Sequence, residues 1–163
     1  VMRSCSDLSV GRSPLVLICQ GVEKPGNLGA MLRTADAAGL AAVVAVDPVT
    51  DWSNPNLVRA SKGTVFSVPV ASADTTQALT WLADNGIALA ATTPDTDLDY
   101  TEVDYTGPLA IAVGAEKYGL TKEILEAADY RIRIPMAGRA NSLNVATSAA
   151  VVIYEAVRQR GQN

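Results

Sequence analysis

Short apolar runs alternate with helix-forming segments along the whole chain. Runs of mostly apolar residues bounded by Gly, Pro or Asp are typical of buried strands. The sequence predicts such strands at residues 14–19, 42–46, 65–70, 87–91, 109–113 and 131–134. It predicts helices between them at residues 30–38, 55–61, 74–82, 121–128 and 142–158. This alternation indicates an α/β domain with a mostly parallel sheet flanked by helices.

Polar and glycine residues mark where several of these helices begin and end. Gly39 is expected as the left-handed C-cap of the helix before it, and Asn85-Gly86 ends another. Asp74, Thr121 and Ser142 have the side chains that favour N-cap positions.

Two segments lie outside this pattern. Residues 1–13 are polar and are expected to form a tail or linker, such as the remnant of an upstream domain, because the chain begins with Val rather than Met. Residues 95–106 are polar and acidic, which predicts an exposed loop. The remainder, residues 14–163, is the size of one domain.

Composition removes several classes of chemistry. The 163 residues include no histidine, which excludes Ser-His-Asp hydrolysis, histidine acid–base catalysis and most zinc enzymes. The two cysteines, Cys5 and Cys19, form neither a zinc motif nor a disulfide framework, so we expect no metal and a reducing cytoplasm. No apolar run approaches the ~18–20 residues that span a bilayer, so no membrane partner is expected.

The net charge of −4 argues against an indiscriminate nucleic-acid binder. A local basic surface remains compatible with RNA, and basic residues gather near three polar segments. They are Lys24, Arg33, Arg59, Lys62, Lys117, Arg131, Arg133 and Arg139.

The three polar segments follow predicted strands, where ligands bind in parallel α/β sheets. The first contains Asn27 and Arg33, which are six residues apart and would lie on opposite sides of a helix. Taken alone, Asn27 can be a helix cap and Arg33 a surface residue. The second runs from Gly114 to Gly119 and contains Glu116; a plain strand–loop–helix turn is the simpler interpretation.

The third polar segment runs from Ile134 to Ala146. Ser142 is a reasonable N-cap, and Asn144 would lie in the first helical turn, where backbone N–H groups favour anions. The spacing in none of the three segments is that of a dinucleotide-binding glycine loop.

Together, in this order, the segments resemble the three motifs of the SpoU/TrmH family of RNA ribose 2′-O-methyltransferases. The family pattern NxGxxxRTA matches residues 27–35, GxExxG matches 114–119, and IPM followed by SLNVA matches 134–146. Residues 59–63 resemble an intermediate segment, and the likeness covers roughly residues 14–160. It is nearest to the ribosomal RNA and thiostrepton-resistance branch.

The resemblance implies a catalytic domain at residues 14–163 with a C-terminal deep trefoil knot, acting as a homodimer on S-adenosylmethionine and RNA. The implied cofactor-binding residues are Thr92, Thr93, Gly114, Ala115, Ile134, Met136, Ser142, Leu143 and Asn144. The implied catalytic residues are Asn27, Arg33, Glu116, Ser142 and Asn144. The basic residues expected to bind RNA are Arg33, Arg59, Lys62, Lys117 and Arg139.

The family candidate for activating the ribose hydroxyl is Arg33. Arginine stays protonated, so we expect it to stabilise developing alkoxide charge, with a substrate phosphate drawing off the proton. Ala115 stands where many members have Ser or Thr, which removes a possible hydroxyl contact.

Ribosomal RNA is the expected substrate, and transfer RNA is the alternative. Two further interpretations stay open: a non-catalytic RNA-binding or dimerisation module of the same fold, and an unrelated flavodoxin-like nucleotide-binding domain.

Overall fold

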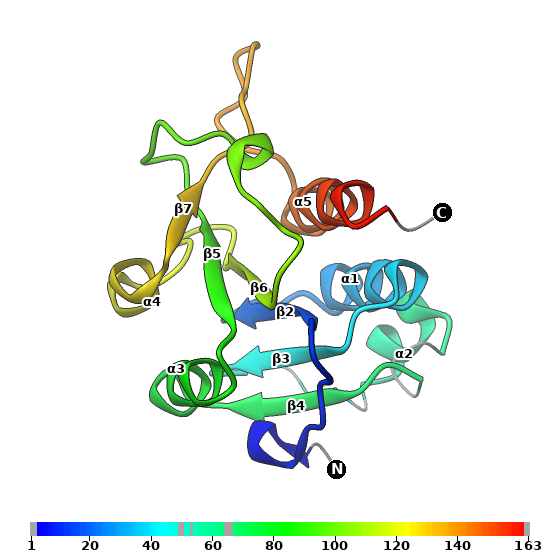
Figure 1. The fold of residues 1–163 in the computed structure, drawn as a ribbon. Helices are drawn as coiled ribbons and strands as arrows, with labels where there is room; N and C mark the ends of the chain where they lie inside the picture. Colours follow the sequence, from blue (N-terminus) through cyan, green and yellow to red (C-terminus); the bar gives the residue numbers. More distant parts are fainter. Residues whose placement is uncertain (1–2, 49–50, 53, 64–66, 162–163) are drawn as a thin grey trace.

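A computed structural model of the chain describes residues 3–48, 51–52, 54–63 and 67–161. Its centre is one seven-stranded sheet with the order β1-β4-β3-β2-β6-β5-β7 (Figure 1). Every strand pair is parallel, as predicted. The strands are β1 (Arg3–Ser4), β2 (Leu15–Gln20), β3 (Ala42–Val46), β4 (Val70–Ala73), β5 (Ala88–Thr92), β6 (Leu109–Gly114) and β7 (Tyr130–Ile132).

Helices cover both faces of this sheet (Figure 1). One face carries α1 (Pro25–Ala38), α2 (Pro55–Ser61) and α5 (Val145–Gln159). The other carries α3 (Thr75–Asp84) and α4 (Lys122–Ala127). Two short 3₁₀ turns, η1 (Cys5–Asp7) and η3 (Tyr100–Glu102), complete the elements.

Alternate residues of each central strand supply two separate cores. In β2, Leu15 and Leu17 face α1 and α5, whereas Val16 and Ile18 face α3 and α4. All six residues of β2 are buried, because helices lie on both faces of a parallel sheet. Glycine allows the closest helix contact: a Cβ on Gly29 of α1 would lie 2.5 Å from the Cβ of Ala60 on α2.

The prediction of a strand at 65–70 is wrong where the structure describes it. Residues 64–66 lie outside the described residues, residues 67–69 form a turn, and β4 begins at Val70. Val68 is nevertheless buried, so its apolar character reflects packing rather than strand pairing. The register is set by β3, whose residues 43–46 pair with residues 70–73.

Two helices begin elsewhere than predicted. Helix α1 begins at Pro25, five residues earlier, because proline fits the first turn of a helix. Asn27 therefore lies within the first turn and is not the cap. Helix α5 begins at Val145, and its N-cap is Asn144 rather than Ser142.

Other caps are confirmed. Gly39 ends α1 with φ of 72° in the left-handed region. Asp74 begins α3 and accepts a hydrogen bond from the backbone N–H of Gln77. Thr121 precedes α4 as expected, but its side chain makes no capping bond.

Residues near the N-terminus pack against the domain instead of forming a free tail. Arg3 and Ser4 pair with β4, and Cys5 is buried in the core beside α3. The prediction of an exposed loop at 95–106 is only partly right, because Val103 and Tyr105 are buried. Their backbone is held by Gln159 of α5, which accepts from Tyr105 N and donates to Val103 O.

The chain returns from β7, at one edge of the sheet, to pack α5 against α1. On the way it hydrogen-bonds the loop after β5: Arg133 N donates to Leu98 O, and Tyr100 N donates to Arg133 O, both at 2.9 Å. This close association of the two segments is compatible with the trefoil knot, which stays a prediction. Among the described helices, none is long and apolar enough to cross a bilayer.

Candidate functional site

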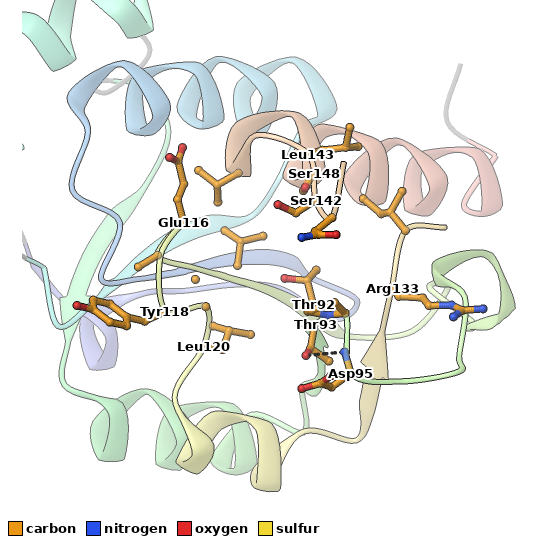
Figure 2. Close-up of a pocket in the computed structure, with 18 of the residues that line it drawn as sticks. Thr92, Thr93, Asp95, Glu116, Tyr118, Leu120, Arg133, Ser142, Leu143 and Ser148 are labelled. Carbon is orange, nitrogen blue, oxygen red and sulfur yellow. Dashed lines mark hydrogen bonds between the residues drawn. The ribbon is translucent and has the colours of Figure 1, made fainter. Parts of the chain in front are cut away.

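A cavity of about 760 Å³ opens at the carboxyl edge of the sheet. Its walls come from the segments that follow β5, β6 and β7, and from the start of α5 (Figure 2). This carboxyl-edge cavity has the size of a site for a cofactor or another small molecule. Its position fits the rule that parallel sheets bind ligands beyond the carboxyl ends of their strands.

All the residues implied as cofactor-binding line this cavity: Thr92, Thr93, Gly114, Ala115, Ile134, Met136, Ser142, Leu143 and Asn144. Glu116 and Lys117 also line it. The sequence analysis did not single out several other lining residues as site residues, among them Asp95, Tyr118, Leu120, Arg133 and Ser148. Strand-end position was the available signal for Asp95, which follows β5 closely.

The three polar segments meet in one hydrogen-bonded cluster, here called the Glu116 network. Asn27 donates to Glu116 Oε1 at 2.7 Å. The Asn144 amide donates to Asn27 Oδ1 at 3.1 Å and approaches Glu116 Oε1 at 3.4 Å. Lys24 completes the network with an ion pair to Glu116 Oε2 at 3.2 Å. Side chains from three distant segments are thus joined directly.

Glu116 is the acceptor at the centre of this network. The hydrogen bonds from Asn27 and then Lys24 lower the pKa of its carboxyl against an opposing desolvation, and the charge of Lys24 adds to the lowering. The carboxylate therefore stays ionised at neutral pH. Beside the cavity it provides a negative charge suited to a cationic ligand.

Asn144 also fixes the start of α5. Its Oδ1 accepts from the backbone N–H groups of Ala146 at 2.9 Å and Thr147 at 3.3 Å. The side-chain oxygen of Asn144 thus caps α5, and its amide nitrogen takes part in the Glu116 network. The predicted anion site in the first turn is therefore occupied at this point by the protein's own side chain.

Gly114 is required by the loop's own packing. A Cβ at this position would lie 2.4 Å from the carbonyl carbon of Gly119 and 2.5 Å from Leu120 N. The loop closes there because Gly119 N donates to Ala115 O at 2.7 Å, with Gly119 at φ of 67°. The expectation that these glycines let a ligand approach is thus only part of their role, because backbone already occupies the space beside Gly114.

The two threonines after β5 use their hydroxyl groups to hold the cavity wall. Thr92 donates to Ala112 O at 2.9 Å, which ties β5 to β6. Thr93 accepts from Asp95 N at 3.2 Å (Figure 2). Arg133 is paired with Asp99 at 2.8 Å and points away from the cavity toward the loop after β5.

Several residues expected at the site do not line the cavity. Arg33 is exposed on α1, and Asn27 is linked to the cavity through its hydrogen bonds with Glu116 and Asn144. Arg59 and Lys62 lie on and just after α2, which packs against α1 rather than against the cavity. Arg139 is exposed in the loop between β7 and α5.

A buried polar network beneath the cavity was missed by the sequence analysis. Gln20, at the end of β2 and only 3% exposed, donates to Thr75 at 3.1 Å and to Thr121 at 3.0 Å. Its oxygen accepts from Thr121 N at 2.9 Å, and Thr75 donates to Asp47 at 2.8 Å. Gln20 directly follows the strand predicted at 14–19, and only the fold shows that it anchors the segment after Leu120.

Within the described part of the chain, no cluster of three or more His, Cys, Asp or Glu residues could hold a metal ion.

The chain is similar in sequence to known RNA methyltransferases. The chain is 37% identical over 148 residues to a 23S rRNA (guanosine-2′-O-)-methyltransferase RlmB from Ralstonia nicotianae, covering 90% of this chain and 59% of the relative. It is 41% identical over 148 residues to a tRNA (guanosine(18)-2′-O)-methyltransferase from Thermus thermophilus, covering 90% of this chain and 75% of that relative. The chain thus spans about three fifths of the length of the RlmB relative.

Solved structures agree. The crystal structure of the SpoU methyltransferase AviRb from Streptomyces viridochromogenes with AdoMet superposes with a TM-score of 0.93 at 31% identity, covering 100% of this chain and 67% of that one. An AdoMet-bound rRNA methyltransferase from Sinorhizobium meliloti superposes with a TM-score of 0.92 at 35% identity, covering 97% of this chain and 61% of that one. The model of the SpoU rRNA methylase family matches residues 14–154. The chain therefore belongs to the SpoU rRNA methylase family.

Proposed function

We propose that this chain is the catalytic domain of an S-adenosylmethionine-dependent RNA methyltransferase that methylates a ribose 2′-hydroxyl. The observation that carries the proposal is the direct hydrogen bonding of Asn27, Glu116 and Asn144 beside one cavity. Relatives named as 2′-O-methyltransferases and structural neighbours with bound AdoMet support it.

The residues of the carboxyl-edge cavity fit S-adenosylmethionine. Its wall combines apolar side chains such as Ile134 and Leu143 with backbone groups near Gly114, which suit an adenine ring. The carboxylates of Asp95 and Glu116 suit the positive charges of the methionine part and the sulfonium. When bound, the cofactor supplies a methyl group on a good leaving group, so the protein mainly aligns the reactants.

In the proposed reaction a C–O bond forms at the ribose oxygen as the C–S bond breaks. The hydroxyl loses its proton, and Arg33 stabilises the developing alkoxide, with a phosphate of the RNA accepting the proton. Glu116 and Asn144 hold the loops around the cofactor, and Asn27 positions the network. Ser142 lines the cavity and lies near the reacting groups in this scheme.

Arg33 does not line the cavity of its own chain, so we propose that it acts across a homodimer. In such an arrangement Arg33 of a second copy approaches the cavity of the first. Arg59, Lys62, Lys117 and Arg139 would contact RNA phosphates, which offsets the overall negative charge. The enzyme would act in the cytoplasm.

Ribosomal RNA is the proposed substrate, in keeping with the likeness to the 23S rRNA methyltransferase RlmB and to the rRNA methyltransferase from Sinorhizobium meliloti. Transfer RNA is the second candidate. The tRNA-modifying relative is 41% identical to this chain, against 37% for the RlmB relative, and the match covers 75% of its length, against 59%.

The test is transfer of a tritiated methyl group from S-adenosylmethionine to total RNA from a strain lacking the gene, followed by mapping of the modified nucleotide. A labelled 2′-O-methyl nucleotide in 23S rRNA is the expected result. A label in transfer RNA would select the second candidate. Tight cofactor binding without transfer to any RNA would contradict catalysis by this chain, and absence of cofactor binding would favour a non-catalytic module.

A further inference from the structure

The loop between β6 and α4 directs two neighbouring side chains to opposite sides. It is closed at its base by the Gly119 N to Ala115 O bond, so residues 116–118 form its tip. Glu116 points toward α1 and joins the Glu116 network. Tyr118 points the other way, outward from the cavity (Figure 2).

Tyr118 is the most exposed large hydrophobic residue in the described part of the chain, at 79%. It also lines the carboxyl-edge cavity. The proposed chemistry does not use this aromatic ring, and the fold does not need it for packing. Its place at the rim puts this exposed ring within reach of RNA whose ribose enters the cavity.

The ring is accompanied by a positive charge. The Lys117 ammonium lies 5.2 Å from the centre of the Tyr118 ring. Lys117 forms no ion pair with a carboxylate among the described residues. The ammonium lies over one face of the ring, and the high exposure of Tyr118 leaves the ring available to a base from its other face. Single-stranded nucleic acid uses this combination: the ring stacks on a base and the cation meets a phosphate.

We propose that Tyr118 and Lys117 form a platform for an unpaired RNA base next to the methylated nucleotide, an inference that rests on the proposed function. Because the platform is at the rim, the base it stacks flanks the ribose in the cavity. Stacking requires an unpaired base, since a base within a duplex has both faces covered by its neighbours. The platform therefore selects a loop, bulge or single strand over a continuous helix.

The experiment compares binding of a fluorescent single-stranded RNA of about 12 nucleotides with binding of the matching blunt duplex. Five forms of the chain are used: unchanged, Tyr118→Ala, Tyr118→Phe, Lys117→Ala and Tyr130→Ala. Tyr130 is a matched control because it is also exposed, at 36%, but lies on β7 and does not line the cavity. Affinity for S-adenosylmethionine is measured in parallel to show that the cavity is intact.

The unchanged chain should prefer the single strand. Tyr118→Ala should weaken single-strand binding by about 5- to 100-fold, because a stacked base is lost. Duplex binding should change little, and Tyr118→Phe and Tyr130→Ala should bind RNA like the unchanged chain. Lys117→Ala should make the slope of log K for single-strand binding against log salt concentration shallower by about 0.7, because one phosphate contact is lost.

Equal single-strand affinity of Tyr118→Ala and the unchanged chain would overturn the platform, as would a preference of the unchanged chain for duplex or no RNA binding by it. Loss of RNA binding together with a change from dimer to monomer by sedimentation would show that a second copy covers Tyr118, and would also overturn it. These results concern the platform alone, because the chain can transfer a methyl group without a role for Tyr118. Failure of the proposed function itself would appear separately, as absent cofactor binding or methyl transfer.

Discussion

Asn144 performs two tasks with one side chain. Its oxygen caps α5, and its nitrogen reaches Asn27 and Glu116. The sequence placed a functional asparagine here through the SLNVA motif. It did not show that the same residue caps the helix, because Ser142 is an equally good cap by residue type and only the backbone path selects between them.

The two tasks can be separated by substitution. Asn144→Ser keeps a capping oxygen but removes the amide donor. We expect cofactor-dependent methyl transfer to fall by about 10-fold or more, as for the loss of a hydrogen bond to a charged group. The midpoint of urea unfolding should move little.

Asn54 provides the control, because it caps α2 by accepting from Asn56 N and does not line the cavity. Asn54→Ser should leave transfer unchanged. Equal activity of Asn144→Ser and the unchanged chain would show that the Glu116 network is not needed for transfer.

Gly114 marks the second residue-scale constraint. Gly114→Ala places a methyl group within about 2.5 Å of the backbone at 119–120, so the loop must move. Overpacking of this kind costs about 1–3 kcal/mol in unfolding free energy, and the displaced loop should weaken cofactor binding.

Gly138 is the matched control, because a Cβ there meets nothing within 4 Å. Gly138→Ala should leave both urea unfolding and calorimetric cofactor affinity unchanged. Unaltered stability and affinity in Gly114→Ala would refute the close backbone packing described for this loop.

At the scale of elements, helix α5 holds the loop after β5. Glu155 is 8% exposed and receives hydrogen bonds from Arg158 at 2.8 and 2.9 Å and from Gln159 at 2.8 Å. Gln159 in turn binds the backbone of Val103 and Tyr105. The loop that begins at the cavity wall is thereby attached to the end of the chain.

This attachment should depend on pH. The hydrogen bonds from Arg158 lower the pKa of Glu155 to about 2, against desolvation and with further help from Gln159. A lowered folded-state pKa gives stability that is present above the ordinary value of 4.5 and lost as pH falls toward 2.

Glu155→Gln should therefore cost about 1 kcal/mol of unfolding free energy at pH 7, a modest value because Arg158 is largely exposed. The difference from the unchanged chain should shrink toward pH 2, as followed by urea unfolding. Glu126→Gln, which breaks the exposed Lys122–Glu126 pair, should show no such trend. A pH-independent cost of Glu155→Gln would contradict the assigned ion pair.

The elements differed in how far the sequence could predict them. The buried strands β2, β3, β5 and β6 were found because their apolar runs are bounded by clear breaks. Strand β4 was misplaced because Val68 is apolar for tertiary packing, which a run of residues does not distinguish from strand burial. Local sequence also did not reveal the Gln20 network, whose partners are 55 and 101 residues away.

At the scale of the whole molecule, the strand order brings the three motifs together. The motifs follow β2, β6 and β7, which belong to the run β2-β6-β5-β7 of parallel strands, so the segments after them share one edge of the sheet. The motif resemblance predicted this convergence, but contacts across 89 and 117 residues depend on topology. The homodimer and the knot remain predictions at this scale.

Action of Arg33 across a dimer can be tested by mixing two inactive variants. Arg33→Ala keeps its cavity, and Gly114→Ala keeps its Arg33. If Arg33 acts on the partner's cavity, each mixed dimer has one complete site of two, and half of the dimers are mixed. The mixture should then recover about a quarter of normal methyl transfer. No recovery from a mixture shown to contain mixed dimers would place Arg33 in its own chain's site.

The account depends most on the carboxyl-edge cavity being the place where S-adenosylmethionine binds. Titration of the ¹⁵N-labelled chain with this cofactor, followed by amide NMR, tests it directly. We predict saturable shifts concentrated at Thr92, Gly114 and Leu143. Little change is expected at Leu79 or Gly86, which line a second hollow between α3 and β5. Shifts concentrated away from the cavity, or no saturable shifts at all, would contradict it.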